Sequence, residues 1–414
     1  MTQVHESRTR APEADVDQEP RPHFPMPRRC PHAPPPEYEE LRDRAPLVRA
    51  TFRDRPVWLV TRHAEAQQLL THPAMSSSPQ RPGHPFTDAA GSPRGTLPGD
   101  FIDMDPPEHN HYRRMLASEF GTRRVRAMRP AIHSVVDEVL DELSGRHEAD
   151  LVADFGMPVA TLVMCRLLGV PYEDRDFFQE RTHTMTKGLT HPEEAEAAFK
   201  EIRGYVDELA HRAARDPGDH LLGRLVRERH RSGGLTHEEL AGMAFLLLVS
   251  GHQTTANMIP LGVYTLLSNP EQLAALRADP VLWPSAVEEL LRYHSIVDWV
   301  ALARVATEDI RVGEQTVRAG EGVFVLGASA NHDERAFAEP AMFDVRRGRR
   351  NHLAFGYGVH QCLGHNLARA ELEIAYQRLF ERLPDLRVLG DPEDLPFRYE
   401  ERTFGLHRLP VTWF

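Results

Sequence analysis

The sequence has few cysteines and no long apolar run, and both absences exclude classes of protein. Its three cysteines, Cys30, Cys165 and Cys362, are too widely spaced for a disulfide framework or a CxxC metal site. The longest apolar run, Met243 to Val249, is far shorter than the ~20 residues that cross a bilayer. We therefore expect a protein of the reducing cytoplasm that has no membrane segment.

Positive charge is also scarce, and the net charge of -12 argues against a nucleic-acid partner. The arginines are nevertheless concentrated in two segments. Six of them lie between Arg113 and Arg129, and the second group is Arg346, Arg347, Arg349 and Arg350. Such segments are typical either of a docking surface for an acidic partner or simply of a solvated surface.

Helical patterns outnumber strand patterns, which predicts a mainly α fold with a smaller β-rich region. Residues 1–36 are polar and proline-rich and lack the apolar stretch of a signal peptide, so we expect a flexible leader there. The chain from 37 to 414 is then one catalytic domain. Helices are expected near 108–119, 124–144, 151–168 and 194–214, and strands at 57–60 and within 304–325.

The clearest helix signal begins at Thr236, which forms a capping box with Glu239 ahead of an apolar run to about Ser268. At 1.5 Å per residue this helix is roughly 48 Å long, so it must cross the core. Two further helices are predicted, one from Pro284 to about His294 and one from just after Cys362 to about Leu383.

The most informative segment is the loop from Phe355 to Gly364, FGYGVHQCLG, which brings one cysteine to the start of a helix. A thiolate there lies among unpaired N–H groups, which favour the charged sulfur that a metal needs. Gly358 and Gly364 would let the backbone approach a flat cofactor, and Phe355 would shield the sulfur from water. The alternatives are a turn with a buried free cysteine, and a phosphate loop, for which the GxGxxG pattern fails.

This loop resembles the haem-binding signature FxxGxHxCxG of cytochromes P-450 at every position. Glu289 to Arg292 is similar to the family's ExxR, and residues 250–255, SGHQTT, resemble its oxygen-activating helix segment. The resemblance extends from about Pro31 to the C-terminus and points to soluble actinobacterial members that oxidise secondary metabolites and xenobiotics. It implies the cytochrome P-450 fold, with haem b between the long central helix and the helix after the cysteine loop.

The resemblance also implies a role for each matching residue. Cys362 would be the iron ligand, in a haem-binding loop with Phe355, Gly358 and Gly364. The partners of the haem propionates would be His109, Arg113, Arg304 and His360. In the oxygen-activating segment, Thr254 takes the place of the reactive threonine, beside Ser250, Gly251 and Gln253. Gln253 replaces the usual acid there.

Further residues match the family's substrate pocket and its structural ion pair. The pocket would include Leu247, Ile296, Val297, Trp299, Thr403 and Phe404, together with the segments 76–100 and 172–200. Their apolar character predicts a largely hydrophobic small molecule. Glu289 and Arg292 would form the ion pair, but the family's third arginine is missing, since its matching position is Met342.

The activity implied is a monooxygenase that hydroxylates or epoxidises its substrate with O2. Because the sequence contains no flavin or iron–sulfur motif, electrons would come from a ferredoxin and its NAD(P)H-dependent reductase, docked by the basic segments. We expect a monomer. The alternatives are peroxide-driven or substrate-assisted chemistry, which Gln253 favours, a binding module with a vestigial cofactor, and a nicotinamide dehydrogenase, which the lack of strand–helix alternation disfavours.

Overall fold

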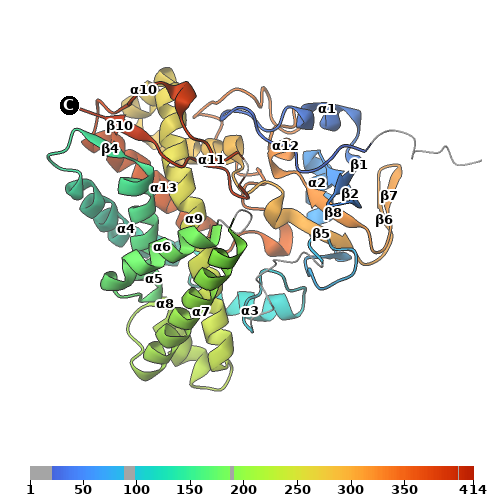
Figure 1. Ribbon diagram of the computed structural model, residues 1–414, viewed down its shortest axis with the longest axis horizontal. Helices are drawn as coiled ribbons and strands as arrows, with labels where there is room; N and C mark the ends of the chain where they lie inside the picture. Colours follow the sequence, from blue (N-terminus) through green and yellow to red (C-terminus); the bar gives the residue numbers. More distant parts are fainter. Residues whose placement is uncertain (1–20, 88–97, 187–190, 400) are drawn as a thin grey trace, which may run out of the picture.

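The computed structural model describes residues 21–87, 98–186, 191–399 and 401–414. Most helices gather on one side of the molecule and the main sheet lies on the other (Figure 1). This arrangement confirms the predicted mainly α fold with a smaller β-rich region. Among the described helices, none combines the length and apolarity that a membrane span requires.

The central element is helix α9 (His237–Ser268), which begins with the predicted capping box. The Glu239 N–H donates to Thr236 Oγ1 (3.2 Å), and the Thr236 N–H donates to Glu239 Oε2 (2.7 Å). Helices α5 (Met157–Leu168), α7 (Pro192–Arg215) and α13 (His365–Arg382) pack around α9. A helix that is covered on several sides needs apolar residues on more than one face. Accordingly, α9 is mostly apolar and buried on both sides of its polar 250–255 segment.

A close approach joins α9 to α13. The Tyr376 hydroxyl donates to the Met258 carbonyl at 2.6 Å. A Cβ on Gly262 would lie only 2.1 Å from that hydroxyl oxygen, so glycine leaves the space that Tyr376 fills. This contact holds together the two helices between which the resemblance places the haem.

The other predicted helices are confirmed with small shifts at their ends. They are α3 (Glu108–Leu116), α4 (Thr122–Glu142) and α11 (Trp283–His294), while the segment predicted at 151–168 begins with a wider π-helical turn, Val152–Gly156, before α5. The remaining helices are α1 (Glu37–Arg44), α2 (His63–Thr71), α6 (Arg175–Thr186), α8 (Leu221–Leu225), α10 (Pro270–Ala278) and α12 (Gly327–Asn331).

The main sheet has five strands in the order β1 (Leu47–Phe52), β2 (Arg55–Val60), β8 (Gly322–Val325), β5 (Ala303–Ala306) and β3 (Met75–Ser76). Only β2 was predicted in the N-terminal part, since no glycine marks the β1–β2 turn; Arg53 and Asp54 adopt positive φ angles instead. The smaller sheets are β4 (Glu148–Asp150), β10 (Pro410–Thr412) and β9 (Arg387–Val388), and the pair β6 (Ile310–Val312) and β7 (Gln315–Val317).

The flexible leader expected over residues 1–36 is corrected in its later part. Residues 1–20 lie outside the described residues, but Phe24 and Met26 are buried beside the main sheet. The Phe24 N–H donates to the Thr51 carbonyl at 2.9 Å, and Arg28 donates to the His294 carbonyl at 2.6 Å. Proline-rich sequence is compatible with an extended segment that packs as well as with a flexible one.

Candidate active site

A backbone hydrogen bond closes the loop from Phe355 to Gly364. The Cys362 N–H donates to the Phe355 carbonyl at 2.8 Å, and α13 begins three residues after the cysteine. Gly358 has φ +74°, and a Cβ there would lie 2.7 Å from the Leu70 carbonyl oxygen at the end of α2. The loop thus needs glycine at this position to reach its conformation.

The groups around Cys362 act on its thiol in opposite directions. The pKa of the thiol is raised overall, because burial outweighs the Gly364 backbone N–H and the Arg113 and Arg369 guanidinium groups, which lower it and are the groups that would stabilise a thiolate. As a whole residue Cys362 is nevertheless exposed, whereas Cys165 is buried. Cys165 differs, because burial and Asp174 raise the pKa of its thiol to about 12. Stabilisation of a thiolate by a helix N-terminus and nearby cations favours Cys362 as the metal ligand.

The four predicted propionate partners come together from three separate segments. The rings of His109, on α3, and His360 are 4.2 Å apart between centroids. Arg113 Nη2 donates to the Gln361 carbonyl at 2.6 Å, directly between His360 and Cys362 in sequence. Arg304, on β5, is only 6% exposed, and burial lowers its pKa to about 10. Its charge acts on both histidines.

This basic cluster of two arginines and two imidazoles fits an anionic ligand. Burial, followed by the charges of Arg304, His109 and Arg113, lowers the pKa of His360 to about 2. Bound carboxylates would offset this repulsion between positive charges, because an opposite charge nearby stabilises the charged form of a basic group. A cofactor with two carboxylates and a metal would suit this donor set, with Cys362 as the ligand of the metal and the cluster as the partner of the carboxylates, and haem is such a group.

In α9, the segment that resembles the family's oxygen-activating motif makes two side-chain hydrogen bonds to the helix backbone. Thr254 Oγ1 donates to the Ser250 carbonyl at 3.3 Å, and Ser250 Oγ donates to the Leu246 carbonyl at 2.5 Å. A Cβ on Gly251 would lie 2.8 Å from Met164 Sδ, so the glycine permits close packing against α5. Gln253 and Thr254 are half-buried.

His252, which was not predicted to have a role, joins this segment to α5. It is 1% exposed, and its Nε2 lies 2.8 Å from Thr161 Oγ1 on α5. Because the Thr161 hydroxyl donates to the Met157 carbonyl, the imidazole Nε2–H is the donor between them. This buried bond joins α9 to α5 at the residue that precedes Gln253 and Thr254.

The predicted pocket residues are only partly brought together. The Phe404 N–H donates to the Ile296 carbonyl at 2.9 Å, which joins the 403–405 turn to the segment after α11. Ile296, Val297 and Thr403 are half-buried, whereas Leu247 and Phe404 are 7% and 4% exposed and mainly pack in the core. The Trp299 ring lies in an aromatic cluster beside the sheet, 5.0 Å from Phe24 and 5.3 Å from Phe324.

The structural ion pair is complete, which corrects the expectation that its third arginine is missing. Glu289 and Arg292 are each 1% exposed and are joined by two 2.8 Å bonds. Arg347 Nε donates to Glu289 Oε1 at 3.0 Å, whereas Met342 is half exposed. A turn closed by the Arg347 N–H and the Asp344 carbonyl returns the chain to α11, which linear spacing did not reveal.

A second buried acid, Glu288, was also missed. Its carboxylate accepts from Arg369 Nε at 2.6 Å, from His352 Nε2 at 3.0 Å, and pairs with Arg350 at 3.1 Å. The Arg369 guanidinium lies 4.6 Å from the centroid of the Phe355 ring. Glu288 therefore connects α11 to both α13 and the cysteine loop; its only sequence signal is its position next to Glu289.

Comparison with known proteins agrees with this geometry. The family model for cytochrome P-450 matches residues 28–410. Pentalenic acid synthase of Streptomyces avermitilis is 45% identical over 392 residues, which cover 94% of this chain and 97% of that protein. Vitamin D3 dihydroxylase of Streptomyces griseolus is 46% identical over 395 residues, with coverage of 95% and 97%.

Solved structures show the same fold. The mycinamicin VIII C21 methyl hydroxylase of Micromonospora griseorubida, bound to mycinamicin VIII, has a TM-score of 0.88 and 43% identity, and the match covers 95% of this chain and all of that one. Cytochrome P-450 MoxA of Nonomuraea recticatena also has a TM-score of 0.88, with 45% identity and coverage of 95% and 98%. The chain belongs to the cytochrome P-450 family of haem-dependent monooxygenases.

Proposed function

We propose that this chain hydroxylates or epoxidises a largely hydrophobic small molecule of the secondary-metabolite kind, with electrons from a ferredoxin and its reductase. The observation that carries the proposal is the position of Cys362 directly beside the basic cluster formed by His109, Arg113, Arg304 and His360. In the loop, His360 of this cluster lies two residues before Cys362. A metal ligand this close to an anion-binding cluster suits a haem with its propionates.

Each residue then has a defined task. Cys362 supplies the thiolate, and the basic cluster binds the propionates, while Phe355, Gly358 and Gly364 shape the loop. Bound haem supplies the activation of dioxygen, and the protein orients the substrate and delivers protons. For proton delivery we assign the Thr254 hydroxyl, with Ser250, Gly251 and Gln253 beside it in the same turns of α9.

The pocket assignment supports a hydrophobic substrate. Ile296, Val297 and Thr403 offer two apolar side chains and one hydroxyl, and Phe404 is joined to Ile296 by a backbone hydrogen bond. The proposed pocket also includes Leu247 and Trp299. An apolar wall with a few polar groups suits molecules of mixed character. Relatives of this chain are named for pentalenic acid, vitamin D3 and mycinamicin VIII, which supports the same class.

An acidic ferredoxin would dock on the face formed by the cysteine loop and the adjoining helices. Tyr357 and Val359 in the loop are 36% and 47% exposed, although they are apolar. Three arginines on the neighbouring α3 and α4 are exposed, namely Arg114, Arg123 and Arg126. An apolar centre bordered by cations is the usual anatomy of a transient interface with an acidic partner.

Not every arginine of the two basic segments is available for docking. Arg129 is paired with Glu373 at 2.7 Å, and Arg124 lies 3.6 Å from Glu119. Arg113 binds the cysteine loop and Arg347 binds Glu289. The proposed docking residues are therefore the exposed arginines of α3 and α4, with Arg346 as a further candidate.

The test is a reconstituted assay with ferredoxin, reductase and compounds selected because they shift the haem absorption. We expect one NAD(P)H and one O2 consumed for each product molecule. Since Gln253 replaces an acid, the competing candidate is peroxide-driven or substrate-assisted turnover. Product formed with hydrogen peroxide alone, at a rate equal to or above that of the ferredoxin system, would favour that candidate.

Thr254 separates the two candidates further. Thr254→Ala removes the hydroxyl that donates to the Ser250 carbonyl, and Thr254→Ser keeps it. If protons reach the site through this hydroxyl, the alanine variant consumes NAD(P)H with little product, whereas the serine variant stays coupled. Equal coupling in both variants would exclude Thr254 from proton delivery.

A further inference from the structure

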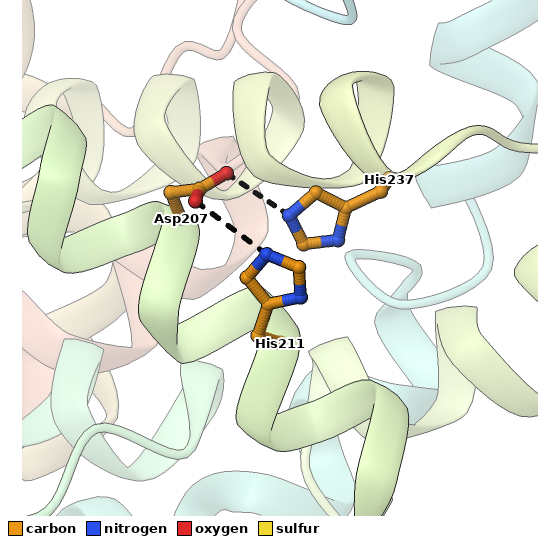
Figure 2. A group of neighbouring side chains, drawn as sticks. All are labelled: Asp207, His211 and His237. Carbon is orange, nitrogen blue, oxygen red and sulfur yellow. Dashed lines mark hydrogen bonds and ion pairs between the residues drawn. The ribbon is translucent and has the colours of Figure 1, made fainter.

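Three metal-ligating side chains meet on the outer surface, where α7 crosses the first turn of α9 (Figure 2). Asp207 and His211 are one turn apart on α7, and His237 is the first residue of α9. His237 Nε2 lies 2.9 Å from one Asp207 carboxylate oxygen, and His211 Nε2 lies 3.7 Å from the other. The two imidazole rings are stacked with centroids 3.8 Å apart.

This arrangement differs from two separate surface ion pairs, because both imidazoles share one carboxylate. Both imidazoles turn the same ring nitrogen toward one carboxylate, as Figure 2 shows. A single carboxylate neutralises only one imidazolium, and two stacked imidazolium rings would repel each other. Two neutral imidazoles and one carboxylate, by contrast, form a ligand set that a divalent ion satisfies.

The distances also suit a metal. Zinc binds histidine nitrogen and carboxylate oxygen at roughly 2.0–2.2 Å, which in a tetrahedral site separates ligand atoms by about 3.3 Å. One ligand atom from each of the three residues lies within 4.8 Å of the other two, and the two imidazoles lie 2.9 and 3.7 Å from the two different oxygens of Asp207, so small side-chain movements would bring the three ligand atoms to that spacing. The side chains of His211 and Asp207 are 54% and 51% exposed, so water can supply a remaining ligand.

We propose that Asp207, His211 and His237 form a binding site for a divalent transition-metal ion of the zinc class. The ion would join the middle of α7 to the start of α9, the helix that carries Ser250 and Thr254. It would act as a cross-link that opposes separation of these two helices, because the ligands are on different elements. The site is remote in sequence from every residue assigned to the haem.

The test uses the untagged holoprotein after treatment with a chelator and dialysis. Calorimetric titration with zinc chloride should show one equivalent bound, and the temperature of unfolding should rise on addition of the metal. His211→Ala and His237→Ala should each weaken zinc binding at least tenfold and abolish that rise. His407→Ala is the matched control, since His407 is an exposed imidazole that faces one carboxylate, that of Glu401, at 3.7 Å.

Folding of each variant is checked from its haem spectrum, and His211 is exposed enough that its replacement should leave the core intact. X-ray absorption at the zinc edge gives an independent measurement, with imidazole scattering and ligands at about 2.0–2.1 Å expected. No zinc binding by the unaltered protein, or equal binding by it and by both histidine variants, would overturn the proposal and leave the cluster as surface ion pairs only. Neither result bears on the haem assignment.

Discussion

Arg347 Nε lies 3.0 Å from Glu289 Oε1, and this bond joins the segment before the cysteine loop to helix α11. The Arg347 side chain is only 10% exposed. It also donates to the Glu339 and Met342 carbonyls, at 3.2 and 3.1 Å. The Arg347 side chain thus joins α11 to the segment from Glu339 to Met342, which precedes the haem-binding loop.

Replacing Arg347 by alanine should destabilise the protein by about 2–3 kcal/mol, because it removes several charge-assisted bonds from buried or turn acceptors. The midpoint of urea unfolding, followed by circular dichroism, measures the change. Arg346→Ala is the control, because Arg346 is the adjacent arginine and its side chain is exposed. Equal midpoints for the two variants would show that the Arg347 contact does not contribute to stability.

Glu288 should make stability depend on pH in the acid range. Although burial raises its pKa, hydrogen bonds from His352 and Arg369 hold it at about 2, below the ordinary 4.5. For the His352 imidazole, burial lowers the pKa, so this ring is neutral at neutral pH and donates to Glu288 as an uncharged group. The positive charge that faces the carboxylate is that of Arg369. A carboxyl with a lowered folded-state pKa stabilises the protein above pH 4.5 and loses that effect as pH falls toward 2.

Glu288→Gln should therefore be less stable than the unaltered protein by about 3 kcal/mol at pH 7, and this difference should shrink between pH 4.5 and 2. Unfolding curves at several pH values measure the difference. A constant difference over that range would mean that the ionisation of Glu288 does not stabilise the fold. Glu373→Gln, at a partly exposed acid of α13, serves as the control.

Cys362→Ser should remove the thiolate, and with it the strong red shift of the Soret band in the dithionite-reduced carbon monoxide complex. The spectrum of that complex is the measurement. Cys165→Ala should leave the band unchanged, because burial keeps the Cys165 thiol neutral. A retained red shift in the serine variant would exclude Cys362 as the iron ligand.

Arg126→Ala should slow reduction by ferredoxin by up to about tenfold at low salt and far less at high salt, because salt screens charge steering. The rate of reduction in stopped-flow mixing is the measurement. Arg53→Ala, an exposed arginine in the β1–β2 turn of the sheet region, should change nothing. An Arg126 effect of equal size at both salt concentrations would contradict docking by charge.

By itself, the sequence determined the features that depend on local pattern. The capping box at Thr236, the apolar length of α9 and the loop around Cys362 are local, since hydrogen bonds and backbone angles within a few residues decide them. The family and the haem followed from the same local motifs, which comparison with known proteins confirmed.

Only the tertiary structure decided which distant residues meet. Arg347 reaches Glu289, Arg369 reaches Glu288, and His252 reaches Thr161 across separations that no periodicity encodes. Phe24 and Met26 pack beside the sheet although their sequence resembles a flexible leader. Burial and charge pairing are properties of the assembled chain, because the free energy of an isolated charge or apolar side chain depends on what encloses it.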